Sequence, residues 1–101
     1  MHAGVVLTHL ACIANSAGTA RFVLFAPGDV HISYLPLAHI YERINVVNAT
    51  HGGAAIGFYS GDVQRLLDDI MVLRPTVFCS VPRLWNRIYD KARISVSFTP
   101  E

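Results

Sequence analysis

The stretch "DVHISYLPLAHIYERI", residues 29–44, contains the change from strand to helix that decides the fold. Residues Val30 to Leu35 are mostly β-branched, aromatic or aliphatic, which is the composition of a buried strand. Pro36 ends this run, because proline has no amide hydrogen to donate to a sheet. The residues from Leu37 to Ala49 then predict a helix. The stretch therefore predicts a strand that passes directly into a helix.

The same alternation continues on both sides of this stretch. Three further short apolar runs predict strands: Gly4–Leu7, Ala55–Tyr59 and Thr76–Val81. Helices are predicted at Thr8–Ala20, at residues 63–73 and from Arg83 to about Ile94. Strands and helices that alternate at this spacing indicate βαβ units on a parallel sheet, so the predicted fold class is α/β. Continuous apolar strands fit this class, because the strands of a parallel sheet are buried on both faces.

Residues with special backbone or capping properties mark the ends of the predicted helices. The hydroxyl of Thr8 can accept a hydrogen bond from a free amide in the first helical turn. Gly52 and Gly53 predict a helix stop, because glycine adopts a positive φ at no steric cost. A close approach of the backbone to a ligand is the alternative interpretation of this glycine pair. Pro82 suits the first turn of the last helix.

The composition is more apolar than a chain of this size needs. Of the 101 residues, 52% are hydrophobic and only 15% are charged, and the mean hydropathy is +0.40. A charged share of about 25% is typical of globular domains. The excess predicts either that the chain packs against a partner or, as we prefer, that it is part of a larger domain. Residues 95–101 are poorly patterned and predict a tail.

Charge and cysteine placement disfavour several classes of function. The formal charge of +1, without a basic patch, predicts no nucleic-acid partner. No apolar run reaches the roughly 18 residues of a membrane span, and no signal-peptide pattern is visible, so we expect an intracellular protein. Cys12 and Cys79 lack metal-ligand spacing and predict free thiols without a metal site. Asn48-Ala49-Thr50 matches a glycosylation sequon, which carries little weight without a secretory signal.

Three blocks, "ISYLPLAHIYERI", "GFYSGDVQRLLDDI" and "LRPTVFCSVPRLWNRIYDK", resemble the middle of the N-terminal domain of eukaryotic, plant-like long-chain acyl-CoA synthetases. These enzymes belong to the adenylate-forming (AMP-binding) superfamily. "GVVLTH" resembles the segment just after the phosphate-binding loop of that family, so the resemblance extends from about Gly4 to Lys91. It implies that residues 1–101 are a partial AMP-binding domain.

The resemblance implies a long-chain fatty acid–CoA ligase. Such enzymes join a fatty acid to ATP, release diphosphate, and pass the acyl group from AMP to the thiol of coenzyme A. Because this chemistry brings negative groups together, a glycine-rich loop, a lysine and Mg²⁺ hold the phosphates. Of that loop only the last glycine has a counterpart, Gly4, and His2 and Ala3 stand where its proline and lysine would. With the C-terminal domain also missing, we expect this chain alone to hold neither ATP nor Mg²⁺ and to be inactive.

The resemblance also assigns a site to the segment after the first buried strand. His39 matches a histidine on the floor of the acyl-adenylate pocket, so it is predicted as a catalytic and substrate-binding residue. Glu42 and Arg43 lie one helical turn further on and are predicted to bind substrate, to orient His39 or to pair with neighbouring helices. The bare spacing favours a structural ion pair for these two residues, and a structural histidine is the alternative for His39. Ligands of such sheets bind beyond the carboxyl ends of the strands, where this segment lies.

Two other classes of function remain as alternatives. In the first alternative, the chain is a non-catalytic module that binds fatty acid or pairs with the full-length enzyme. In the second, it is an unrelated flavodoxin-like domain with the same βαβ order. The family resemblance allows peripheral association with endoplasmic reticulum or peroxisomal membranes. The sequence itself carries no organelle address that we recognise.

Overall fold

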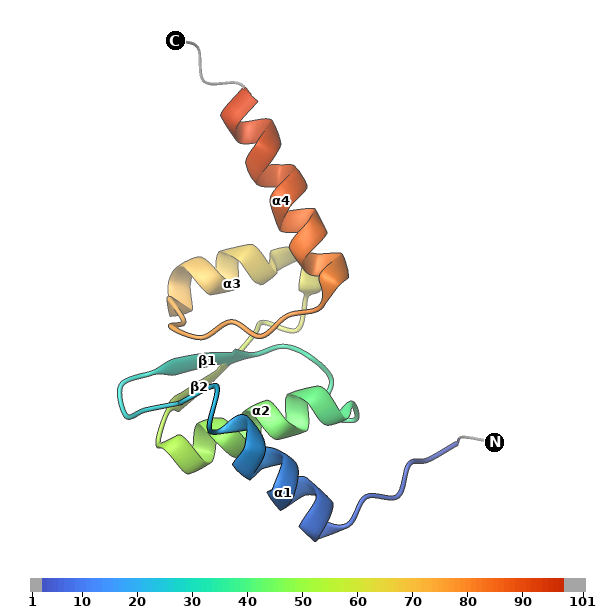
Figure 1. Cartoon of the computed structure of the whole chain (residues 1–101). Helices are drawn as coiled ribbons and strands as arrows, with labels where there is room; N and C mark the ends of the chain where they lie inside the picture. The colour runs from blue at the N-terminus through green and yellow to red at the C-terminus, as the bar shows by residue number, and fades with distance from the viewer. Residues whose placement is uncertain (1–2, 98–101) are drawn as a thin grey trace.

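The computed structural model describes residues 3–97 of the chain (Figure 1). The elements are, in chain order, α1 (His9–Thr19), β1 (Val30–Ser33), α2 (Ile40–Gly52), β2 (Ala55–Phe58), the 3-10 helix η1 (Val63–Arg65), α3 (Leu66–Leu73) and α4 (Pro82–Ser97). Of the tail predicted at residues 95–101, residues 95–97 belong to α4 and residues 98–101 lie outside the described residues.

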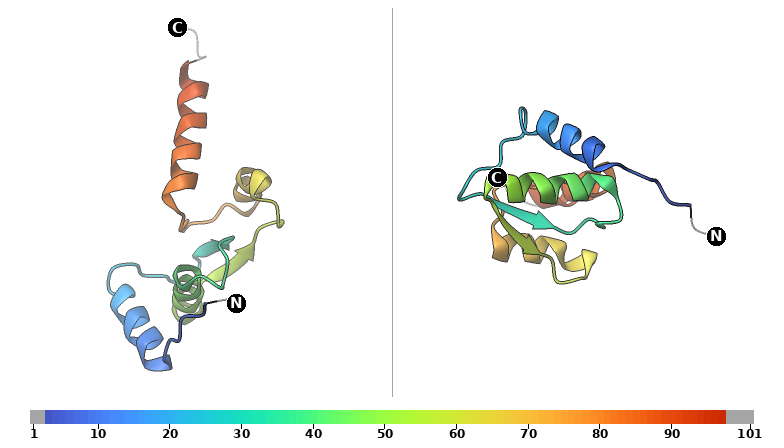
Figure 2. Two further views of the ribbon diagram at one scale, coloured as in Figure 1. Left: turned by 90° about the vertical axis from the view of Figure 1, so that its right-hand side faces the viewer. Right: turned by 90° about the horizontal axis from the view of Figure 1, so that it is seen from below.

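Strands β1 and β2 form a parallel pair, in which Val30 lies opposite Ala55 and Ser33 lies opposite Phe58. Helix α2 connects the two strands, so the three elements form one βαβ unit. Helices α2 and α1 lie on one side of the pair and α3 lies on the other, while α4 extends away from the layers (Figures 1 and 2). The predicted α/β class with a parallel sheet is confirmed.

The strand predicted at Gly4–Leu7 is wrong. These residues have no regular structure, and Val5 and Val6 are 87% and 95% exposed. A strand requires a neighbour that satisfies its backbone N–H and C=O groups. The described part of the chain places no strand beside this segment. Residues 4–7 have the apolar composition of a strand, but no strand of the described chain pairs with them.

The strand predicted at Thr76–Val81 is also wrong. Among the described residues, this segment forms only one β-bridge with the sheet, between His31 and Val77 on the edge of β1 opposite β2. At the start of this pairing, the acceptor is a side chain rather than a backbone carbonyl group. Thr76 Oγ1 accepts the amide hydrogen of Val30 at 2.9 Å. The backbone then leaves the sheet toward Pro82, so the pairing is too short to make a strand.

Alternate residues of β1 point to opposite faces of the sheet. Ile32 of β1 and Tyr34, the residue after the strand, point to what we call the apolar face, where they cluster with Leu66 of α3 and Leu84 of α4. His31 and Ser33 point to the other side, which α2 covers. We call this the polar face, because four buried polar residues lie on it, beside the apolar ring of Phe25: His31, Ser33, Glu42 and Asn45.

Helix ends follow the predicted capping residues. Thr8 caps α1, since its hydroxyl accepts the amide hydrogen of Ala11 at 3.1 Å. Gly53 ends α2 with a φ of 74°, which confirms the predicted helix stop. Pro82 begins α4, as predicted. Helix α2 begins at Ile40 rather than at the predicted Leu37.

Gly52 allows a close backbone approach, but not to a ligand. A Cβ atom added at Gly52 would lie 2.3 Å from the carbonyl oxygen of Phe25, far inside van der Waals contact. The ring of Phe25 meets the His31 ring edge-on, with centroids 5.9 Å apart. Gly52 therefore lets the loop before β1 close over the polar face.

Candidate functional site

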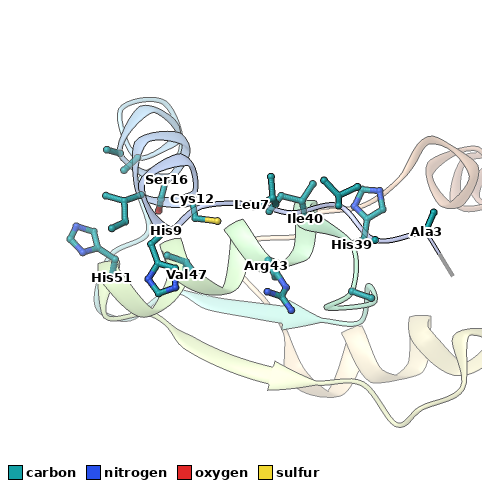
Figure 3. Close-up of a pocket in the computed structure, with 16 residues that line it drawn as sticks. Ala3, Leu7, His9, Cys12, Ser16, His39, Ile40, Arg43, Val47 and His51 are labelled. Atoms are coloured by element: carbon teal, nitrogen blue, oxygen red, sulfur yellow. The ribbon is translucent and has the colours of Figure 1, made fainter.

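A groove of about 1060 Å³ lies between residues 3–7, α1 and α2 (Figure 3). Its larger apolar residues come from all three segments: Val5, Leu7, Ile13, Ile40 and Val47. Its polar residues include one arginine and three histidines: His9, Cys12, Ser16, His39, Arg43 and His51. No acidic residue lines this groove within the described part of the chain. Apolar walls with cationic and hydrogen-bonding groups suit an amphipathic anion.

His39 lies at the N-terminal end of α2 and is exposed to the groove (Figure 3). Its Nδ1 atom accepts the amide hydrogen of Tyr41 at 3.2 Å, so the imidazole is the N-cap of the helix. Because Nδ1 is the acceptor, the neutral ring carries its proton on Nε2. The Nε2–H group is thus available to donate to a ligand oxygen, close to the partial positive charge of the helix end.

Arg43 lies one turn after His39 and also lines the groove (Figure 3). Its Nε atom donates to the carbonyl oxygen of Leu37 at 2.9 Å, which fixes the stem of the guanidinium group. The terminal nitrogens keep their N–H groups for an anionic ligand. The structure therefore brings His39 and Arg43 to the same groove.

Glu42 lies elsewhere. It is not among the groove-lining residues, and its side chain is fully buried against β1. Its Oε1 atom lies 3.0 Å from Nε2 of His31, which is also fully buried. Asn45 donates from Nδ2 to Oε2 of the same carboxylate at 3.5 Å. Glu42 thus bonds a strand histidine rather than orienting His39 or Arg43 directly.

Sequence reasoning missed His31. The residue sits in the "VHIS" strand, between two apolar neighbours, and its ring is sealed from solvent. Its Nδ1 atom has no hydrogen-bond partner within the described residues. A titratable residue inside a buried strand was the available signal, since such a group needs a partner.

A second polar contact joins the two helices that form the groove. Ser16 of α1 donates to Oδ1 of Asn48 of α2, and Asn48 is only 3% exposed. Its Nδ2 atom has no partner among the described residues. A buried asparagine inside a helix is no acceptor for a glycan, so the sequon at Asn48 has no structural support.

Cys79 lies beyond β1, beside Tyr41, and is half-buried. Burial raises the pKa of its thiol, although a hydrogen bond with Tyr41 acts in the opposite direction. A raised pKa keeps the thiol protonated and a poor nucleophile. Burial likewise raises the pKa of the Tyr41 and Tyr34 hydroxyls. These groups act as neutral hydrogen-bonding side chains.

The donor set of the groove does not suit Mg²⁺. Mg²⁺ prefers carboxylate oxygens, and the groove offers none. The described residues contain no cluster of three or more His, Cys, Asp or Glu side chains that could hold a metal ion. The chain's single lysine, Lys91, belongs to α4 rather than to the groove.

Within the described residues, no helix is both long and apolar enough to cross a membrane.

The fold and the groove define an α/β segment that presents a histidine and an arginine beyond the end of a buried strand. Residues 2–99 match the family described as AMP-binding enzyme, and the chain belongs to that family. Enzymes of this family use ATP and Mg²⁺. Membership makes the flavodoxin-like alternative wrong.

Several of the similar curated proteins are named long-chain acyl-CoA synthetases or long-chain-fatty-acid–CoA ligases. Long chain acyl-CoA synthetase 7, peroxisomal, of Arabidopsis thaliana is 66% identical over 87 residues, 86% of this chain. The peroxisomal synthetase 6 of the same plant is 63% identical over 85% of the chain, and long-chain-fatty-acid–CoA ligase 5 of Rattus norvegicus is 47% identical over 89%. The chain spans 12–14% of the length of these relatives. No solved structure matches it.

Proposed function

We propose that the chain is the part of a long-chain fatty acid–CoA ligase that forms the floor of the acyl-adenylate site. The reaction joins fatty acid, ATP and coenzyme A into acyl-CoA, AMP and diphosphate. In this proposal His39 donates from Nε2 to an oxygen of the substrate carboxyl group. Arg43 attracts the same negative group, and Glu42 acts behind them without touching the substrate.

The position of His39 carries this proposal. The imidazole is exposed in a groove with apolar walls and no acidic residue, and its Nδ1 bond to Tyr41 leaves Nε2 as a donor. An acyl chain needs the apolar walls, and a carboxyl or acyl-phosphate group needs the donor. The high identity to two peroxisomal long-chain acyl-CoA synthetases supports the choice of substrate.

The test uses synthetase 7 of A. thaliana in which the matched 87-residue segment is replaced by that of this chain. We call this chimera the host enzyme. His39→Asn removes the imidazole but keeps a good N-cap residue, so the helix should still form. We expect kcat/KM for acyl-CoA formation to fall about 10²-fold, as for the loss of one donor to a developing charge. A His39→Asn host with unchanged kinetics would refute the assignment.

Arg43→Ala in the host tests the second groove residue. A cation that attracts the substrate equally in ground and transition states affects KM more than kcat. We therefore expect the KM for fatty acid to rise about 10-fold, the rough value of one charge-assisted hydrogen bond. Arg87→Ala on the exposed surface of α4 is the matched control. Equal kinetics of the two variants would remove Arg43 from the site.

We propose further that the 101-residue chain alone forms no acyl-CoA. The sequence contains no glycine-rich phosphate loop, and its single lysine lies on α4. Purified chain is incubated with palmitate, ATP, Mg²⁺ and coenzyme A, with the host enzyme as positive control. Turnover by the chain alone would overturn this part of the proposal.

The names of two relatives support a peroxisomal location, and we propose it for the enzyme that carries this segment. We propose that this enzyme associates with the membrane peripherally. No helix of the described residues could span a membrane. Co-migration of tagged full-length enzyme with a peroxisomal marker tests the location. Recovery with endoplasmic reticulum markers would contradict it.

A second candidate is a chain that binds fatty acid without turning it over. The apolar groove walls, with Arg43 beside them, favour this alternative. Displacement of a fluorescent fatty acid from the purified chain measures such binding. Val47→Glu places a negative charge in the groove and should abolish it, whereas Val72→Glu on the exposed side of α3 should not. Equal binding by both variants would exclude the groove as the binding site.

A further inference from the structure

The polar face contains a buried bond that the groove chemistry does not use. Nε2 of His31 and Oε1 of Glu42 are 3.0 Å apart, and both side chains are 0% exposed. Asn45 adds a weaker bond to the second carboxylate oxygen. The ring of Phe25 meets the His31 ring edge-on and closes the face on the other side.

Stability alone does not account for this pair. Removing a carboxylate from water is costly, and well-packed apolar residues in place of a buried pair often give an equally stable protein. A buried polar bond has one property that apolar packing lacks, namely direction. It holds one rotation of α2 against β1, whereas apolar side chains tolerate several.

That rotation decides where His39 points. Glu42 belongs to the first turn of α2, three residues after His39, and successive helical residues are about 100° apart around the axis. With Glu42 held against the strand, His39 and Arg43 lie on the groove side (Figure 3). A rotation of α2 by less than the roughly 100° between successive residues would already move the His39 ring relative to the groove.

We propose that His31, through its bond to Glu42, is a positioning residue that orients His39 in the acyl-adenylate site. The inference rests on the proposed function of His39. Neither His31 nor Glu42 touches the substrate in this arrangement. Both residues act by fixing the first turn of α2, whose Tyr41 amide donates to the His39 ring.

The test compares three forms of the host enzyme. The apolar pair, His31→Leu with Glu42→Met, keeps the site filled but removes the bond. Glu42→Gln keeps an acceptor for His31 but replaces the carboxyl group by an amide. We expect kcat of the folded enzyme to fall about 10-fold for the apolar pair and about 3-fold for Glu42→Gln, because small misplacements of catalytic groups reduce rates by such factors or more.

The decisive measurement repeats these changes in a His39→Asn background. A residue that acts only through His39 has no effect once the imidazole is gone, so each change should then lower kcat less than about 2-fold. Asn48→Ala, which removes another buried polar group from α2, is the matched control, and its effect should add to that of His39→Asn. Full additivity for the apolar pair and for Glu42→Gln would overturn the inference.

Hydrogen exchange supplies a second measurement that does not depend on turnover. The peptide that contains the Tyr41 amide should exchange slowest in the host, faster with Glu42→Gln and fastest with the apolar pair. If the apolar pair fails to fold, a second pair that removes the bond, His31→Phe with Glu42→Leu, replaces it, and unchanged kcat in that folded pair overturns the inference. A His39→Asn host without a kinetic defect refutes the proposed function itself, which separates the two failures.

Discussion

The two faces of strand β1 are built on opposite principles. On the apolar face, Ile32 and Tyr34 pack with Leu66 and Leu84, each at most 8% exposed. On the polar face, His31 and Glu42 of α2 are buried equally deeply. Apolar burial stabilises in proportion to area and has no preferred direction. Buried polar groups gain little net stability but allow only a few arrangements.

This difference separates two requirements of the same strand. The apolar face holds α3 and α4 to the sheet, and small changes of packing there alter stability more than geometry. The polar face holds α2, the helix whose first residues line the groove. In the arrangement that we propose, stability and the orientation of the site therefore depend on different sides of a four-residue strand.

The largest effect is expected when one partner of the polar face is removed. Glu42→Ala leaves the buried His31 ring without its hydrogen-bond partner, and such a loss typically costs about 3–5 kcal/mol of unfolding free energy. Urea unfolding of the chain, followed by circular dichroism, measures it. The apolar pair should be far less destabilising, because no polar group is then left unpaired. Equal losses for both variants would show that the bond carries no special role.

A smaller loss is expected on the apolar face. Ile32→Ala removes buried methyl groups from the cluster with Leu66 and Leu84, which should reduce the unfolding free energy by about 2–4 kcal/mol. Ile32→Val, which removes one methyl group, should cost only about 1 kcal/mol. The same urea measurement applies. Graded losses of this kind are the signature of packing, and an all-or-none response would contradict the comparison.

The apolar face was the more predictable of the two from sequence. The composition of residues 30–35 predicted a buried strand, and Ile32 and Tyr34 are indeed buried. Strand existence was less predictable, because a strand depends on its neighbour. Residues 4–7 have the right composition and no partner, and at Thr76 a hydroxyl replaces the backbone in the ladder.

The site divides in the same way. The exposed position of His39 beyond a strand followed from the proline and the helical pattern after it. The partner of Glu42 did not, because His31 lies eleven residues earlier in another element and only the fold brings them together. Spacing within a helix suggested that Glu42 orients His39 or pairs with a neighbouring helix, and such rules cannot report a contact with the strand.

An intermediate effect is expected where the loop before β1 closes the polar face. Gly52→Ala would place a methyl group 2.3 Å from the carbonyl oxygen of Phe25, so the loop must shift away from α2. We expect a loss of about 1–3 kcal/mol in unfolding free energy and faster hydrogen exchange around His31. Gly18→Ala in α1 is the control, because the added methyl group meets nothing within 4 Å. A Gly18→Ala variant should gain stability slightly, through helix propensity.

The smallest effect is expected at the start of β1, where both faces meet. Asp29 accepts hydrogen bonds from the amide of Ala26 at 2.9 Å and from the hydroxyl of Thr76 at 2.8 Å. The first of these bonds, followed by the second, lowers the pKa of Asp29 below its ordinary value of 3.8. A carboxyl group whose pKa is lowered on folding stabilises the chain above the unfolded pKa, and this contribution is lost as the pH falls through the folded pKa.

Asp29→Asn should therefore make the loss of stability below pH 3.8 less steep, with little effect at neutral pH beyond the two weakened bonds. Unfolding midpoints in urea, measured from pH 6 down to pH 3, follow this change. Asp68→Asn on α3 is the matched control, since Asp68 is exposed and its side chain makes no hydrogen bond in the described chain. The hydrogen bond between Asp29 and Thr76 holds the start of β1, which belongs to both faces of the strand. Loss of this bond should therefore increase hydrogen exchange equally at Ile32 and His31. Faster exchange at His31 alone would place the anchor on the polar face instead.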